Sequence, residues 1–178
     1  MAKADVEAGK MVIELEESIG NKPVKVSRGA GYDVLVRSKD VEKHIEAKGI
    51  RRNDKFFAIN GLAGVRNLLF DNNYYIYFCD VSHDVILVTS GDFVIKSMGW
   101  SGAEGSKKLV RAWTDTADAI KEVLKIAVVG RITFTLKNPI RTLIQDLQQN
   151  PNSVDPSIRD TIKALWKRGK GGWTKIYP

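Results

Sequence analysis

The sequence contains almost no cysteine and no long hydrophobic run. Cys79 is the single cysteine among 178 residues, so an intramolecular disulfide and a zinc site built on cysteine pairs are both excluded. This usage suits a reducing compartment. No apolar run approaches the roughly 18 residues that a membrane span needs. The first residues, MAKADVEAGK, lack the apolar segment of a signal peptide. We therefore expect a protein with no membrane partner that is cytoplasmic, or nuclear if its source has a nucleus.

Histidine is scarce as well, and no nucleotide-binding loop is present. His44 and His83 stand apart in the sequence, so we expect satisfied or solvent-exposed side chains rather than metal ligands. Residues 99–105 contain three glycines, but the following Ser106-Lys107 breaks the GxxxxGK[ST] spacing of a phosphate loop. ATP binding through this motif is therefore excluded.

The composition is that of a folded protein with a basic end. Hydrophobic residues make up 43% and charged residues 28% of the chain, which is typical of one soluble globular domain. The formal net charge is +7, and residues 131–178 supply most of it, with nine Lys and Arg against three Asp and Glu. This excess indicates a polyanionic partner. The alternative is a solvated basic tail that only aids solubility.

The hydrophobic pattern predicts an α/β fold with a mixed central sheet flanked by helices. Residues 1–130 would form this core, and residues 131–178 a helical, basic C-terminal extension packed on it as part of one compact domain. Asn138 and Asp155, each followed by proline, are the expected helix N-caps of the extension. The expected helices are 4–19, 62–69, 107–129, 139–149 and 156–168. The expected strands are 24–26, 32–37, 43–48, 56–59, 74–81, 85–89 and 132–136.

The most informative segment is the predicted hairpin of the strands 32–37 and 43–48. Because side chains alternate along a strand, Glu46 and Lys48 share one face. A turn at residues 38–40 makes paired residue numbers sum to about 80, which places Asp33 opposite Ala47 and diagonal to both charged residues. Two carboxylates and one ammonium would then converge.

Such a cluster is suited to Mg²⁺, which takes one or two carboxylates plus waters and substrate phosphate. Hydrolysis of a phosphodiester needs a metal that neutralises charge and orients water in line with the leaving oxygen. Asp33 and Glu46 would hold Mg²⁺, or Mn²⁺ as a substitute, and the carbonyl of Ala47 could add a ligand. Lys48 would position the nucleophile. The alternative is a cross-strand salt bridge on a surface hairpin.

The run GYDVLVRSKDVEKHIEAKG, preceded by a helix and a short strand, resembles the D…ExK core of the PD-(D/E)xK nuclease superfamily. Within it, the likeness is to the Mrr-like branch and to the C-terminal domain of NO VEIN proteins, where a GYD strand precedes an IEVK-like strand. It covers about residues 5–90 and continues through Phe56–Asn60 and the aromatic strand Tyr74–Tyr77. The resemblance implies a restriction-endonuclease-like core, which is a metal-dependent DNA-cleaving fold, with Asp33, Glu46 and Lys48 at the active-site positions.

The resemblance also implies an acidic residue on the first helix. Anchoring the helix on Val12-Ile13 places that position at Gly9 or Lys10, which are not acidic. Glutamates stand nearby, at Glu7, Glu14 and Glu16, but none falls in the expected place.

The C-terminal run from Trp166 to Lys175 combines four cations, three glycines and two tryptophans, a composition that suits phosphate contacts and base stacking. Trp166 fits a different role, as part of the apolar face of the predicted helix 156–168. We expect DNA contacts from seven cations: Arg28, Arg51, Arg52, Lys167, Arg168, Lys170 and Lys175.

The leading hypothesis is a Mg²⁺-dependent DNA endonuclease that acts in defence or DNA processing, as a homodimer or within a larger nuclease complex. The second is a DNA-binding module of the same fold that does not cleave and serves as a subunit of a larger complex. The third is a small interaction domain whose basic end binds an acidic protein.

Overall fold

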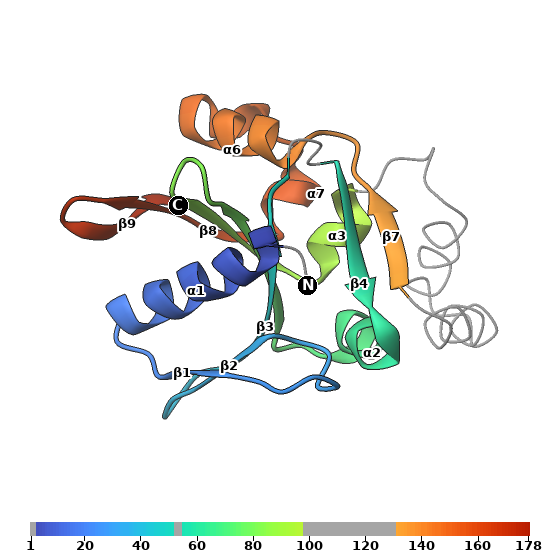
Figure 1. Cartoon of the computed structure of the whole chain (residues 1–178). Helices are drawn as coiled ribbons and strands as arrows, with labels where there is room; N and C mark the ends of the chain where they lie inside the picture. The colour runs from blue at the N-terminus through green and yellow to red at the C-terminus, as the bar shows by residue number, and fades with distance from the viewer. Residues whose placement is uncertain (1–2, 52–54, 98–130) are drawn as a thin grey trace.

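The computed structural model describes residues 3–51, 55–97 and 131–178 (Figure 1). The predicted loop 99–105, the predicted helix 107–129 and Arg52 lie outside these residues. The described part is a mixed α/β fold, as predicted, with a seven-stranded sheet flanked by helices. No helix in this part is both long and apolar enough to cross a membrane.

The large sheet has the order β1-β2-β3-β5-β6-β8-β9. Neighbouring strands are antiparallel except β3 and β5, which run parallel. A parallel pair needs a crossover connection, and here the connection contains β4 and helix α2. The strands are β1 (Pro23–Lys25), β2 (Val34–Arg37), β3 (Glu42–Gly49), β5 (Tyr74–Asp80), β6 (Val85–Ser90), β8 (Ile162–Gly169) and β9 (Gly172–Tyr177).

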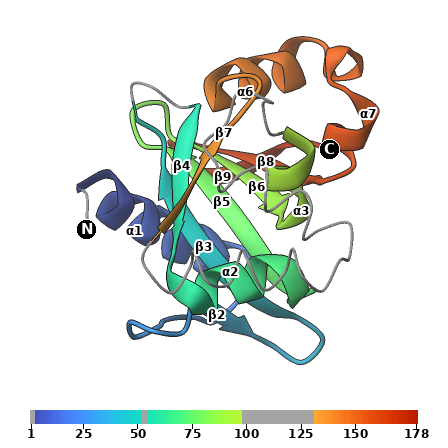
Figure 2. The ribbon, with the colours of Figure 1, turned by 90° about the vertical axis from the view of Figure 1, so that its right-hand side faces the viewer.

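A second, two-stranded sheet lies beside the first. It pairs β4 (Phe56–Asn60) with β7 (Arg131–Thr135) in antiparallel register, with Ile59 opposite Ile132. Figure 2 shows β4 and β7 in front of the large sheet. The two strands were both predicted, but their pairing joins segments about 75 residues apart and was not.

Helices cover both faces of the large sheet. Helix α1 (Lys3–Ser18) packs on one face through Ala8, Met11, Val12 and Leu15, against a cluster that includes Tyr77 and Cys79. The thiol of Cys79 is fully buried, and burial raises its pKa. The other helices are α2 (Gly61–Phe70), α3 (Asp92–Ser97), α6 (Ile140–Gln149), the 3₁₀ helix η1 (Pro151–Ser153) and α7 (Pro156–Arg159).

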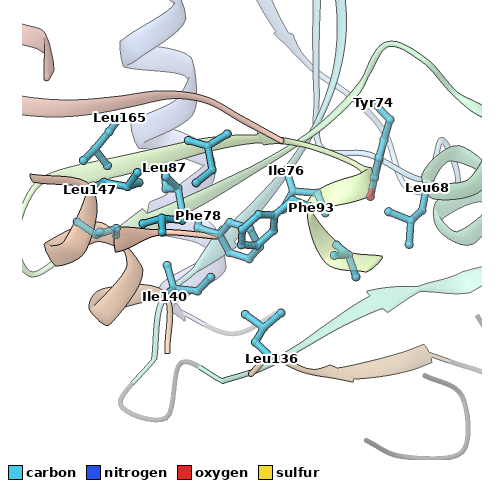
Figure 3. Packing of buried hydrophobic residues seen from close by; sticks show 14 of the residues in the cluster. Leu68, Tyr74, Ile76, Phe78, Leu87, Phe93, Leu136, Ile140, Leu147 and Leu165 are labelled. Carbon is cyan, nitrogen blue, oxygen red and sulfur yellow. The ribbon is translucent and has the colours of Figure 1, made fainter. Parts of the chain in front are cut away.

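The opposite face carries the larger apolar cluster. Its members come from β5, β6 and β8 together with α2, α3 and α6, and Figure 3 shows how Phe78 and Phe93 meet at its centre. Their ring centroids lie 5.5 Å apart at 60°. The strand β5 is buried on both faces, as its continuous apolar run predicts.

The predicted helix 156–168 is wrong beyond Arg159. Asp155 caps a single short turn, accepting a hydrogen bond from the Ser157 N–H at 2.8 Å, and the chain then enters β8. Strand β8 pairs with β6, and β9 pairs with β8 at the edge of the sheet. Residues 162–169 and 172–177 are therefore strands of the central sheet and not a helical extension. The cap of α6 also differs: it is Pro139, one residue after the expected Asn138.

Glycine is needed at two positions where backbones approach closely. A Cβ on Gly31 would lie 2.5 Å from the carbonyl carbon of Ala63 in α2, and the residue has a left-handed φ of +82°. A Cβ on Gly49 would lie 2.5 Å from the carbonyl oxygen of Ala4 in α1. Gly31 thus lets the loop before β2 approach α2, and Gly49 lets the end of β3 approach the start of α1.

Replacing Gly31 with alanine is expected to destabilise the fold by about 2–4 kcal/mol, because left-handed strain and overpacking act together. Gly29→Ala is the matched control, since Gly29 has a φ of +101° but a Cβ at this position would meet no atom within 4 Å. It should cost only the conformational part, about 1–2 kcal/mol. Urea unfolding of the two variants measures the difference. Equal losses would contradict the close approach to α2.

Candidate active site

The β2–β3 hairpin brings Asp33 to the middle of β3. The ladder pairs Val34 with Ile45, one residue away from the predicted register. Asp33, immediately before β2, donates its N–H to the Ile45 carbonyl at 2.8 Å. Its side-chain Oδ2 accepts a hydrogen bond from the Ala47 N–H at 2.9 Å. The carboxylate is therefore fixed beside the backbone between Glu46 and Lys48.

Glu46 and Lys48 project from the same face of β3, as predicted. The Lys48 Nζ lies 2.7 Å from Glu46 Oε1, and the two side chains are only 11% and 13% exposed. They share their face of the sheet with Ile76 and Phe78 of the neighbouring β5. This ion pair is therefore held in a largely apolar setting and differs from the solvated salt bridge that is common on a surface hairpin.

Burial sets the ionisation of the two carboxylates. It raises the pKa of Glu46 to about 7, against the opposing attraction of Lys48 and with help from the negative charge of Asp33. Burial also raises the pKa of Asp33, although the hydrogen bond from Ala47 and the charge of Lys48 favour the ionised form. Two carboxylates with pKa values raised in this way would be stabilised in the charged form by an additional cation.

Helix α1 contributes an acidic residue that the sequence reasoning missed. Asp5 accepts a hydrogen bond from the Gly49 N–H at 3.1 Å, and its other oxygen lies 3.4 Å from the guanidinium of Arg51. The charge of Asp5 also raises the pKa of both Asp33 and Glu46. The sequence analysis placed the acidic residue at Gly9 or Lys10. In the structure, the first turn of α1, which contains Asp5, contacts the end of β3.

The three glutamates considered on the first helix are engaged elsewhere. Glu7 pairs with Lys10 at 3.1 Å, and Glu14 pairs with Arg168. Glu16 is fully buried and contacts Lys43 at 3.1 Å. The signal that could have identified Asp5 is the glycine after the ExK motif, because it marks a close approach of another backbone to this end of β3.

The expected DNA-contacting cations fall into two groups. Arg28 is exposed in the loop before β2, and Arg51 is exposed two residues after the end of β3 at Gly49. Both therefore lie near the ends of the strands that carry the carboxylates. Lys167, Arg168, Lys170 and Lys175 lie on or between β8 and β9, with β5 and β6 separating them from β3. The two groups are therefore not brought together in one cluster.

His44 is fully satisfied, as expected. Its Nδ1 lies 2.5 Å from Asp71 Oδ2, its Nε2 lies 2.8 Å from Glu42 Oε1, and its ring stacks on Tyr32 with centroids 4.7 Å apart. Burial lowers the pKa of His44, but the two carboxylates outweigh it and raise the pKa above its usual 6.5. The His44 side chain therefore joins the β2–β3 hairpin to the turn before β5.

A pH-dependent stability is expected from this contact. Because the folded pKa is raised, the contribution of His44 is complete below pH 6.5 and is lost as the pH rises through the higher folded value. His44→Gln removes it. The free energy of unfolding from urea titrations should therefore fall more steeply between pH 6 and pH 8.5 for the wild type than for His44→Gln. Parallel curves would show that the ion pairs contribute nothing.

The donor set at Asp33 and Glu46 is one of hard oxygens. Within residues 3–51, 55–97 and 131–178, no group of three or more His, Cys, Asp or Glu side chains is placed to hold a metal ion. Two carboxylates remain, and Mg²⁺ can be bound by one or two when waters and substrate phosphate complete its six positions. The arrangement thus fits a cation that is held jointly by protein and substrate.

Comparison with known proteins gives one family match. Residues 6–84, less than half of the chain, match the family described as Protein NO VEIN, C-terminal. The match spans α1 to the turn after β5, and so includes Asp33, Glu46 and Lys48 but not Asp5. No curated protein and no solved structure matches the chain.

Proposed function

We propose that this protein is a Mg²⁺-dependent DNA endonuclease whose active site is formed by Asp33, Glu46 and Lys48. The observation that carries the proposal is the near-complete burial of Glu46 and Lys48 as an ion pair beside the Asp33 carboxylate, with the pKa of Glu46 raised to about 7. Burying charged side chains costs desolvation free energy, and charged side chains with strongly shifted pKa values cluster at functional sites. The match of residues 6–84 to the NO VEIN C-terminal family is compatible with this proposal.

The two carboxylates would hold the metal. Asp33 is already oriented by the Ala47 N–H, and Glu46 by Lys48, so neither side chain has to be ordered when a cation binds. The carbonyl of Ala47 is a further candidate ligand. When bound, Mg²⁺ would neutralise the phosphate and lower the pKa of a water molecule.

Lys48 would act on the phosphate and the attacking water. In the structure its ammonium lies 2.7 Å from the Glu46 carboxylate. A bound cation would take up part of the negative charge of Glu46 and so weaken this ion pair. The Lys48 ammonium could then donate a hydrogen bond to a phosphate oxygen or orient the water. The water oxygen would form the new bond to phosphorus while the bond to the leaving oxygen breaks. The low exposure of the pair strengthens these interactions because little bulk water competes.

Two kinds of measurement test the proposal. Supercoiled plasmid should be nicked with Mg²⁺ or Mn²⁺ and remain intact with chelator.

Mg²⁺ should also raise the melting temperature more at pH 8 than at pH 6. The direction of this pH dependence follows from the raised pKa of Glu46. The stabilisation that protonated Glu46 gives the folded state is lost as the pH rises from 4.5 through about 7. Below about pH 7, a metal ion must also displace the proton of Glu46 before it can bind. Intact plasmid and no thermal shift with either metal would refute the proposal.

A non-cleaving DNA-binding module is the second candidate. It is favoured by the Glu46–Lys48 ion pair, which already neutralises one carboxylate, and by the absence of a third metal-binding side chain at the site among the residues described. This function predicts duplex binding that weakens steeply with salt, and no product with any divalent metal. For the enzymatic proposal, breaking both strands would require either two successive cuts by one site or two sites, and two sites would be supplied by a homodimer or a larger nuclease complex.

A further inference from the structure

The two C-terminal strands carry a concentration of positive charge. We define the β8–β9 ribbon as residues 162–177. No acidic residue follows Asp160, whereas the ribbon contains five cations: Lys163, Lys167, Arg168, Lys170 and Lys175. All charged side chains of the ribbon itself are therefore positive.

The tip of the ribbon projects beyond the rest of the sheet. Pairing of β8 with β6 ends at Lys167 opposite Val85, whereas β8 and β9 remain paired as far as Gly169 and Gly172. Figure 1 shows the ribbon extending at the left, past helix α1. A two-stranded ribbon of this kind is narrow enough to enter the major groove of duplex DNA.

Arg168 fixes the ribbon instead of offering its charge to a partner. Its guanidinium contacts the carboxylates of Asp84 and Glu14 and lies 5.4 Å from the ring centroid of Trp173. These contacts join the ribbon to the β5–β6 turn and to α1. Arg168 is therefore a positioning residue, and a partner does not have to order the ribbon when it binds.

The four lysines have the opposite character. Lys163, Lys167, Lys170 and Lys175 are all exposed. Within the part of the chain that the structure describes, none of these four forms a salt bridge with a carboxylate, and Lys163 contacts only the Asp160 carbonyl, at 3.5 Å. Binding of phosphate therefore does not require the rupture of an existing ion pair.

The tryptophans distinguish a duplex from a single strand. Trp166 and Trp173 are partly buried against the apolar cluster under α1, and the Trp173 Nε1 is buried. Rings held in this way are poorly placed to stack on unpaired bases, which is what strengthens single-strand binding. Phosphate contacts by lysine remain, and these suit the regular backbone of a duplex.

We infer that the β8–β9 ribbon binds the phosphate backbone of duplex DNA through Lys163, Lys167, Lys170 and Lys175, at a surface separate from the candidate active site. Three strand spacings, about 14 Å, separate β8 from β3 across the sheet. The inference deepens the proposed function by assigning its duplex substrate a second contact surface, but it requires no hydrolysis. A duplex bound by the ribbon would add affinity without touching Asp33, Glu46 or Lys48.

The test measures binding of a fluorescent 30-base-pair duplex by anisotropy in chelator, so that cleavage cannot contribute. The ribbon variant combines Lys167→Gln, Lys170→Gln and Lys175→Gln. The matched control combines Lys22→Gln, Lys39→Gln and Lys137→Gln, which removes the same charge from exposed lysines elsewhere. The ribbon variant should raise the Kd at least tenfold and lower the slope of log K against log salt by about 2–3, while the control should change the Kd less than threefold.

Several outcomes would overturn the inference. Equal weakening in both variants would show that only net charge matters. Tighter binding of a 30-nucleotide single strand, or equally tight binding of polyglutamate, would assign the ribbon to another partner. Failure of the nuclease proposal gives a different result, because plasmid would stay intact with Mg²⁺ while the anisotropy difference between the two variants remained.

Discussion

Replacing Lys48 with alanine is expected to lower Mg²⁺-dependent plasmid nicking by at least about a hundredfold. Lys48 is the only cation within ion-pair distance of Glu46 among the described residues, and it is 13% exposed. Its loss removes the group that would hold the water or a phosphate oxygen, and it leaves the Glu46 carboxylate buried without a partner. Lys39→Ala, at an exposed position of the β2–β3 turn, is the control and should leave the rate unchanged.

Two isosteric variants separate metal binding from phosphate binding. Asp33→Asn and Glu46→Gln should abolish nicking to the same extent, and they should also remove the Mg²⁺-induced rise in melting temperature at pH 8. Lys48→Ala should keep that rise, because it deletes no candidate ligand. Full cleavage by all three variants would dispose of the site, and a thermal shift preserved in both carboxamide variants would place the metal elsewhere.

Replacing Glu16 with alanine is expected to destabilise the protein by about 3–5 kcal/mol, which corresponds to a fall of about 10 °C in melting temperature. Glu16 is fully buried between α1 and the sheet. It accepts hydrogen bonds from Tyr77 at 2.5 Å, Asn21 at 2.6 Å and Lys43 at 3.1 Å. The alanine variant would leave the Lys43 ammonium and the buried Tyr77 hydroxyl without these partners.

The neighbouring Glu17 supplies the control for this network. It is exposed, so Glu17→Ala should change the free energy of unfolding by less than about 0.5 kcal/mol. Glu16→Gln keeps an acceptor for Tyr77 and should lose less than the alanine variant, which preserves the test if Glu16→Ala fails to fold. A loss below about 1 kcal/mol for Glu16→Ala would mean that the buried ion pair contributes little beyond its own desolvation cost.

Local sequence patterns were sufficient for much of the fold and for the centre of the candidate site. The period of the apolar residues predicted α1, and the alternation around residues 38–40 predicted the β2–β3 hairpin. Because side chains alternate along a strand, Glu46 and Lys48 had to share a face wherever β3 was placed. Asp33 followed from the same hairpin, apart from a shift of one residue in register.

The C-terminal strands could not be predicted in the same way. Ile158, Ile162 and Leu165 are spaced as on a helix, but the segment that follows residue 161 also fits a strand, and a short apolar run cannot distinguish the two. The edge of β6 decides between them. Its backbone groups need hydrogen-bonding partners, and β8 provides these from Ile162 to Lys167.

The sequence by itself determined the α/β class, the hairpin and the identity of three charged residues on it, because these depend on contacts between near neighbours. Only the tertiary structure placed Asp5 against Gly49, which lies 44 positions away, and brought β8 and β9 into the sheet. It also decided the electrostatics of the site. The pKa of a carboxylate depends on how much water surrounding elements remove, and residues distant in sequence set that burial for Glu46.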